Sequence, residues 1–111
     1  MPEPKSMLEA TAEANNLTAV ASVKDSYVSA MEEICGGEKP FVNPKTLESK
    51  HTELRNEAID SFDKIPKMGG KEFSESYREQ LVMELDQAFE RFEAQNKSKN
   101  MFKYEINCYF Q

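Results

Sequence analysis

The stretch LEATAEANNLTAVASVKDSYVSAMEEICGG, residues 8–37, has the sequence features of one long helix. Its larger apolar residues recur at helical spacing, at Leu17, Val20, Tyr27, Met31 and Ile34. Ser6 and Glu9 match the S-x-x-E capping box at one end, and Gly36-Gly37 provides a residue that can end a helix at the other. We therefore expect one long helix over about residues 6–35.

A second helix is predicted over about residues 43–65. Asn43 is placed to cap it and Pro44 suits its first turn, whereas Pro66 should end it. The face of this helix that we expect to pack in the core carries residues spaced three or four apart: Leu47, His51, Leu54, Ala58 and Phe62. We interpret the single histidine in this set as a packed or hydrogen-bonded side chain, because the sequence offers no partner ligands for zinc.

The third predicted helix, over about residues 71–96, carries the most regular apolar pattern in the chain. Its expected core residues are Phe73, Tyr77, Leu81, Leu85, Phe89 (or its neighbour Ala88) and Phe92. The polar segment QNKSKN, residues 95–100, is interpreted as the exit from this helix. Gly69-Gly70 separates it from the second helix.

Three amphipathic helices with short connections predict an all-α fold, an antiparallel three-helix bundle with a long first helix. A composition with 31% charged residues and only four glycines fits this better than a many-turned β fold. Ala10, Ala14 and Ala21 are expected to allow close helix packing within the bundle. The alternative is that part of the first helix projects beyond its partners and forms a docking surface.

The sequence argues against several classes of function. A net charge of −6 disfavours a nucleic-acid partner, and no apolar run is long enough to insert into a membrane. Gly69-Gly70-Lys71 lacks the serine or threonine that follows the lysine of a phosphate loop, because Glu72 stands there. Cys35 and Cys108 could form one disulfide, but two reduced thiols are favoured. We therefore expect no catalytic residues, no metal and no cofactor, and a helical interaction or structural module.

Three segments resemble the middle domain of the atlastins, dynamin-superfamily GTPases that fuse endoplasmic-reticulum membranes. They are PKSMLEATAEANNLTAVASVKDSYVSAMEEICGGEKPF (residues 4–41), KMGGKEFSESYREQL (residues 67–81) and NKSKNMF (residues 96–102). The resemblance covers about residues 3–102 and implies a three-helix bundle between a GTPase domain and a membrane anchor. In that family GTP and Mg²⁺ bind the GTPase domain, to which no residue here corresponds. We therefore do not expect this chain to be an enzyme.

The resemblance also implies how the bundle is used. Residues 1–5 correspond to the linker, with Pro2, Pro4, Lys5 and Ser6 as hinge residues. Asn15 and Asn16 become a possible interaction surface. The implied partners are an atlastin-type GTPase domain and the middle domain of a second copy, on the cytosolic side of the endoplasmic reticulum.

The chain departs from the family pattern at Pro66 and in the divergent tail, residues 101–111. Without the family's anchor segment, the chain is expected to be soluble and not to insert into a membrane. The alternative function is a free-standing or truncated helical interaction module without GTPase activity.

Overall fold

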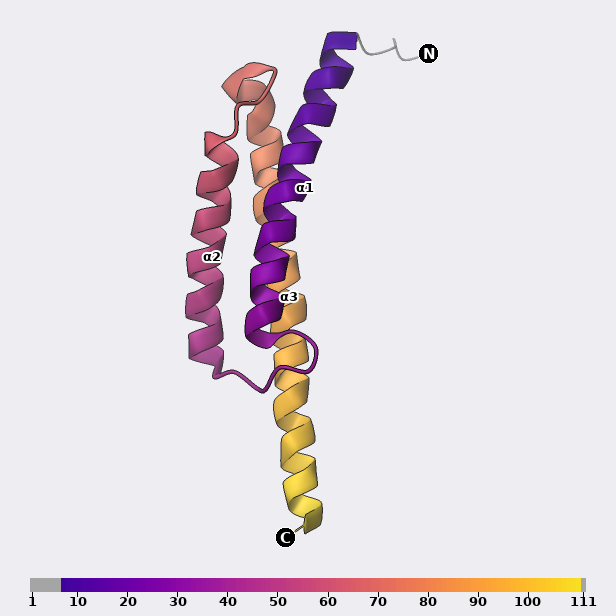
Figure 1. Ribbon diagram of the computed structural model, residues 1–111, viewed down its shortest axis with the longest axis vertical. Helices are drawn as coiled ribbons and strands as arrows, with labels where there is room; N and C mark the ends of the chain where they lie inside the picture. Colours follow the sequence, from indigo (N-terminus) through magenta and orange to yellow (C-terminus); the bar gives the residue numbers. More distant parts are fainter. Residues whose placement is uncertain (1–6, 111) are drawn as a thin grey trace.

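Three helices follow one another up, down and up, as Figure 1 shows for the computed structural model. The structure describes the backbone of residues 7–110 and the side chains of residues 7–99. Helix α1 spans Met7–Cys35, α2 spans Pro44–Lys64 and α3 spans Gly70–Phe110. Each helix contacts the other two. The predicted all-α three-helix bundle is confirmed.

The predicted helix boundaries around the two loops agree with the structure. Beyond α1, Gly37 adopts a positive φ of 45°, a conformation that favours glycine. Asn43 caps α2 as its side chain accepts a hydrogen bond from the Lys45 amide at 2.9 Å, and Pro44 opens the helix. Helix α2 ends at Lys64, because Ile65 is extended, as expected of a residue that precedes a proline.

The predicted end of the third helix near Asn96 is wrong, since α3 continues to Phe110. The segment QNKSKN contains neither glycine nor proline, so its polarity does not interrupt the backbone hydrogen bonds of a helix. In Figure 1 the end of α3 runs well past the α1–α2 loop, and the first turns of α1 extend past the α2–α3 loop.

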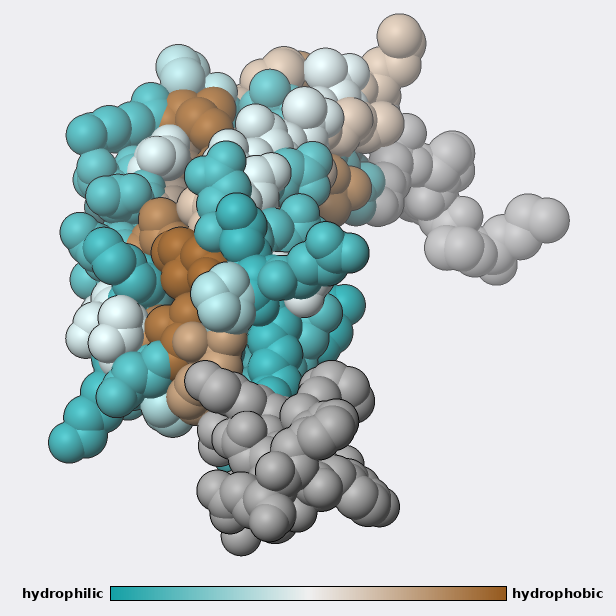
Figure 2. Space-filling model, turned by 60° about the horizontal axis from the view of Figure 1, so that its bottom comes forward, coloured by the Kyte–Doolittle hydropathy of each residue, from teal (hydrophilic) through white to brown (hydrophobic). Residues whose placement is uncertain are grey.

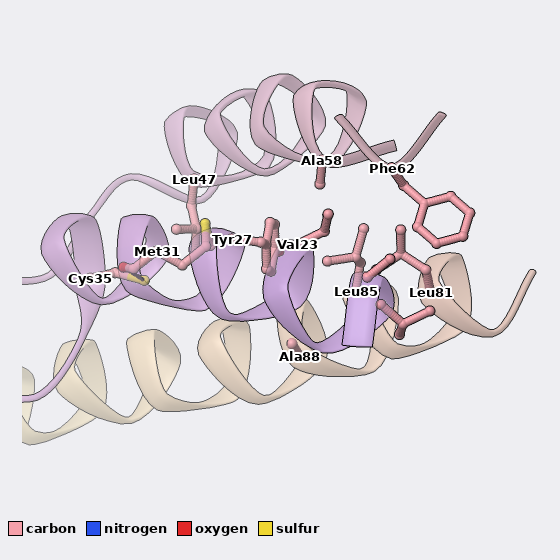
Figure 3. Close-up of a cluster of buried hydrophobic side chains, with 12 residues drawn as sticks. Val23, Tyr27, Met31, Cys35, Leu47, Ala58, Phe62, Leu81, Leu85 and Ala88 are labelled. Atoms are coloured by element: carbon pink, nitrogen blue, oxygen red, sulfur yellow. Dashed lines mark hydrogen bonds between the residues drawn. The ribbon is translucent and has the colours of Figure 1, made fainter. Parts of the chain in front are cut away.

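The core lies along the axis where all three helices meet, and Figure 3 shows that each helix contributes side chains to it. Predicted core residues that are buried are Val20, Tyr27, Met31, Leu47, Ala58, Phe62, Leu81 and Leu85. Partly buried residues that pack against them are Ile34, Leu54, Tyr77, Phe89 and Phe92. Cys35, a free thiol, is also buried in this cluster.

Leu17 corrects the core prediction for α1, because 45% of its surface is exposed. The buried face of this helix instead runs through Ala12, Asn16, Ala19, Val20 and Val23. A polar residue, Asn16, occupies a position on that face which apolar periodicity would not select. The apolar periodicity of the sequence therefore predicts the wrong buried face for the first half of α1.

Two further expectations about packing are corrected or refined. Ala10, Ala14 and Ala21 are exposed, and the alanines of α1 that permit close packing are Ala12 and Ala19. Phe73 is only half-buried and packs against the ring of Tyr77, with a centroid distance of 5.5 Å. It is therefore peripheral to the core.

The outer surface carries many hydrophilic side chains. Figure 2 shows one face, on which a narrow band of hydrophobic side chains is bordered by hydrophilic ones. Among the described residues, three Lys or Arg ion pairs join neighbouring helices: Lys24 of α1 with Glu84 of α3 at 3.4 Å, Arg78 of α3 with Asp63 of α2 at 3.0 Å, and Arg55 of α2 with Asp86 of α3 at 3.0 Å. Such pairs, which are all at least partly exposed, contribute little stability, so the buried core carries most of it.

Candidate functional site: two loop clamps and an interhelical polar network

The loop between α2 and α3 is held by two asparagines of α1, the helix that it does not join. Asn15 Oδ1 accepts a hydrogen bond from the Met68 amide at 2.9 Å. Asn16 Nδ2 donates to the Met68 carbonyl at 3.1 Å and to the Ala12 carbonyl at 2.8 Å. We call Asn15 and Asn16 with Met68 the upper clamp.

The upper clamp changes the interpretation of the two asparagines. Asn16 is fully buried, so its side chain is not on an exposed interaction surface, contrary to the prediction. Its Oδ1 has no hydrogen-bond partner among the described residues. Asn15 is half-buried, and its contact with a second domain stays a prediction.

The loop between α1 and α2 is held in the same way by α3. Asn96 Oδ1 accepts from the Val42 amide at 2.9 Å, while its Nδ2 donates to the Val42 carbonyl at 2.7 Å. Lys99 Nζ donates to the Cys35 carbonyl, at the end of α1, at 2.7 Å. We call Asn96 and Lys99 with these backbone groups the lower clamp.

The sequence predicts that Asn96 belongs to a polar segment that leaves the third helix. In the structure Asn96 is instead buried within α3. A signal was present, because Asn96 lies four residues after Phe92 and so continues the inward-facing pattern of α3. Only 2% of its surface is exposed. A buried amide at a core position requires partners, and the nearby loop backbone supplies them.

We predict that Asn96→Ala lowers the free energy of unfolding by about 1–3 kcal/mol, because it leaves the amide and carbonyl of Val42 without their partner. Urea denaturation measures the loss. Asn56→Ala is the matched control at an exposed position of α2, where a change within about 0.5 kcal/mol is expected. Equal stability of the two variants would contradict the lower clamp.

A polar network joins the three helices at mid-height. The Tyr27 hydroxyl of α1 lies 2.6 Å from Nδ1 of His51 in α2, and the His51 ring stacks on Phe89 of α3 with a centroid distance of 3.9 Å. On the other side of the ring, Nε2 lies 3.7 Å from Asp86 Oδ1. Arg55 Nε donates to the same oxygen at 3.0 Å. The interpretation of His51 as a packed, hydrogen-bonded side chain is confirmed.

Burial dominates the electrostatics of the network. It raises the pKa of Tyr27 well above the ordinary range, and the negative charge of Asp86 raises it further. Burial also lowers the pKa of His51, although Asp86 opposes this effect. At neutral pH both side chains are therefore uncharged, which suits a hydrogen bond between them. Burial likewise raises the pKa of the Cys35 thiol, so this group is not an activated nucleophile.

The described part of the chain offers little for catalysis. No group of three or more His, Cys, Asp or Glu side chains in it could hold a metal ion. Residues 7–110 form a helical bundle, and no nucleotide-binding domain lies among them. No described helix is both long and apolar enough to cross a membrane. The predicted hinge residues Pro2, Pro4, Lys5 and Ser6 lie outside the described residues, as does the capping role of Ser6.

Comparison with known proteins identifies close relatives of the chain. No family model matches it. Over 102 residues, or 92% of the chain, it is 57% identical to Atlastin-3 of Mus musculus, 55% identical to Atlastin-3 of Homo sapiens and 54% identical to Atlastin-1 of Bos taurus. The chain spans 19% of the length of the two Atlastin-3 proteins and 18% of that of Atlastin-1. It is therefore similar to one segment of these relatives.

Proposed function

On the premise that this chain is an atlastin segment, we propose that it is the helical middle domain of a GTPase that tethers and fuses endoplasmic-reticulum membranes. In this role the bundle is a lever. It transmits the movement produced by GTP-driven dimerisation of GTPase domains to a membrane anchor, and itself carries no catalytic residue.

The observation that carries the proposal is the pair of clamps. Each loop is hydrogen-bonded to the helix that it does not join, through Met68 at one end of the bundle and through Val42 at the other, where Lys99 also binds the carbonyl of Cys35 at the end of α1. Helices tied at both ends and packed on a dense core move as one body, because such cores do not deform continuously. A rigid body of this kind suits the transmission of a rotation about a short hinge.

The proposed partners follow from the same premise. They are an atlastin-type GTPase domain and the middle domain of a second copy, and the hinge would be the linker at Pro2, Pro4, Lys5 and Ser6. GTP and Mg²⁺ would bind the GTPase domain and not this bundle. The place of action would be the cytosolic side of the endoplasmic reticulum.

A chimera tests the proposal. In Atlastin-3 of Mus musculus, this chain replaces the matching segment, and GTP-dependent lipid mixing between proteoliposomes is measured together with GTP hydrolysis. We expect the chimera to fuse vesicles. Asn16→Ala and Asn96→Ala should lower the fusion rate without lowering the rate of hydrolysis, because they weaken the lever and leave the nucleotide site unchanged.

Asn56→Ala serves as the control and should fuse vesicles like the unmodified chimera. Circular dichroism at the assay temperature establishes that every variant is folded. A folded chimera that hydrolyses GTP but does not fuse vesicles would contradict the assignment to a middle domain. Clamp variants that fuse at the full rate would contradict the role of stiffness.

A further inference from the structure

The α2–α3 loop is held against α1 through the backbone of Met68, whose amide and carbonyl both bind asparagine side chains. We propose that the upper clamp is a latch: Met68 and the two glycines after it move away from Asn15 and Asn16 in a local opening, while the lower clamp stays closed. The inference concerns the bundle alone, so it does not depend on the proposed membrane function.

The two clamps differ in how completely the buried asparagine is hydrogen-bonded. At the lower clamp, Asn96 uses both its Oδ1 and its Nδ2 on the backbone of Val42. At the upper clamp, Asn16 Nδ2 donates to the carbonyls of Ala12 and Met68, but Oδ1 is buried and has no partner among the described residues. A buried acceptor without a donor has lost its hydration and gained nothing in return. The closed upper clamp therefore carries an unfavourable term that the lower clamp lacks.

Opening of the upper clamp removes this unfavourable term. The Nδ2 and Oδ1 atoms of Asn16 belong to one planar amide group, so a movement of Met68 that frees the donor also admits water to the acceptor. The hydrogen bonds to Met68 are then exchanged for hydrogen bonds to water, which changes the free energy little. Oδ1 in addition gains a donor that it does not have in the closed state. The upper end of the bundle should therefore open more readily than the lower end.

The moving part of the loop is bounded on the side of α2. The Lys67 ammonium donates to the carbonyls of Phe62 and Ile65, in the last turn of α2 and just beyond it. The Ile65 amide also donates to the carbonyls of Ser61 and Phe62. The loop up to residue 67 is thus fastened to α2 and stays with this helix when the latch opens.

Two successive glycines form the hinge of the latch. Gly69 and Gly70 have positive φ angles of 94° and 78°. Glycine has no Cβ and moves between positive and negative φ without steric hindrance. Rotation at these two residues can displace the peptide groups of Met68 while α2 and α3 stay packed in the core. Switches commonly place such rotations in a few residues at the end of an element.

Hydrogen exchange of the two buried side-chain amides tests the latch, measured by NMR on the isotope-labelled full chain. Burial and hydrogen-bond number both predict that Asn16 is at least as protected as Asn96. Asn16 is 0% exposed against 2%, and its Nδ2 donates two hydrogen bonds against one. The latch predicts the opposite order, with the Asn16 side-chain protons exchanging about ten- to hundredfold faster. Exchange of Asn16 that is equal to or slower than that of Asn96 would overturn the proposal.

Urea distinguishes local opening from unfolding of the whole bundle. A local opening exposes little surface, so dilute urea should leave the Asn16 exchange rate nearly unchanged. The backbone amide of Met68, which binds Asn15, should show the same weak dependence on urea. A steep dependence at Asn16 would assign its exchange to global unfolding and would also contradict the latch.

A matched pair of glycine substitutions tests the hinge. Gly70 and Gly37 both have positive φ, and an added methyl group at either would extend into open space. Gly70→Ala strains the closed latch and should speed the exchange of Asn16 by about fivefold or more. Gly37→Ala strains the α1–α2 loop, which keeps its conformation when the latch opens, and should leave the Asn16 rate unchanged. Equal Asn16 rates in the two variants would refute the hinge. If a variant does not fold, the comparison of Asn16 with Asn96 in the unmodified chain decides.

Discussion

Replacing Phe62 with alanine is expected to lower the free energy of unfolding by about 3–5 kcal/mol, the range for removing a buried phenylalanine ring from a core. Phe62 is 1% exposed, lies near the end of α2 and belongs to the buried cluster to which all three helices contribute (Figure 3). Its ring also faces the Lys67 ammonium at 4.2 Å. The substitution therefore removes both core volume and a cation–π contact.

Urea denaturation monitored by circular dichroism measures this loss. Phe73→Ala is the matched control, because Phe73 is half-buried and its ring contacts that of Tyr77 near the start of α3. We expect the control to lose clearly less stability than Phe62→Ala. If the two losses were equal, the burial of Phe62 would not be the source of its effect.

Leu81→Ala has the second largest expected effect, a loss of about 2–5 kcal/mol. Leu81 is completely buried, with Leu85 one turn further along α3, so alanine would leave a cavity that packed neighbours cannot fill. Tyr77→Ala should cost less than Leu81→Ala, since Tyr77 is only partly buried.

The control for Leu81→Ala is Leu17→Ala, the same chemical change at a residue that is 45% exposed. A loss of about 1 kcal/mol or less is expected there, because much of the Leu17 side chain already contacts water and its removal therefore loses little buried apolar surface. Thermal and urea denaturation both report the difference. A loss at Leu17 as large as that at Leu81 would show that the first half of α1 packs differently from the structure.

Most of the local structure could be predicted from the sequence. The cap at Asn43, the stop before Pro66 and the glycine turn after Cys35 all depend on neighbouring residues and appear where expected. Most of the inward faces of α2 and α3 was also predicted, because their apolar residues repeat at helical spacing, although Phe73 is peripheral and the buried Asn96 was not expected. The far end of α3 was missed, since a polar segment without glycine or proline is compatible with either a helix or an exit.

The sequence alone therefore determined the three helices, their order and most of the core, because caps, breakers and periodicity act between residues close together in the chain. Only the tertiary structure decided that Asn16 and Asn96 are buried clamps, that Leu17 faces outward, and that Tyr27 meets His51. Each of these depends on residues from different helices. A polar side chain becomes a core residue when a distant backbone group supplies its hydrogen bonds, and sequence spacing does not encode that meeting.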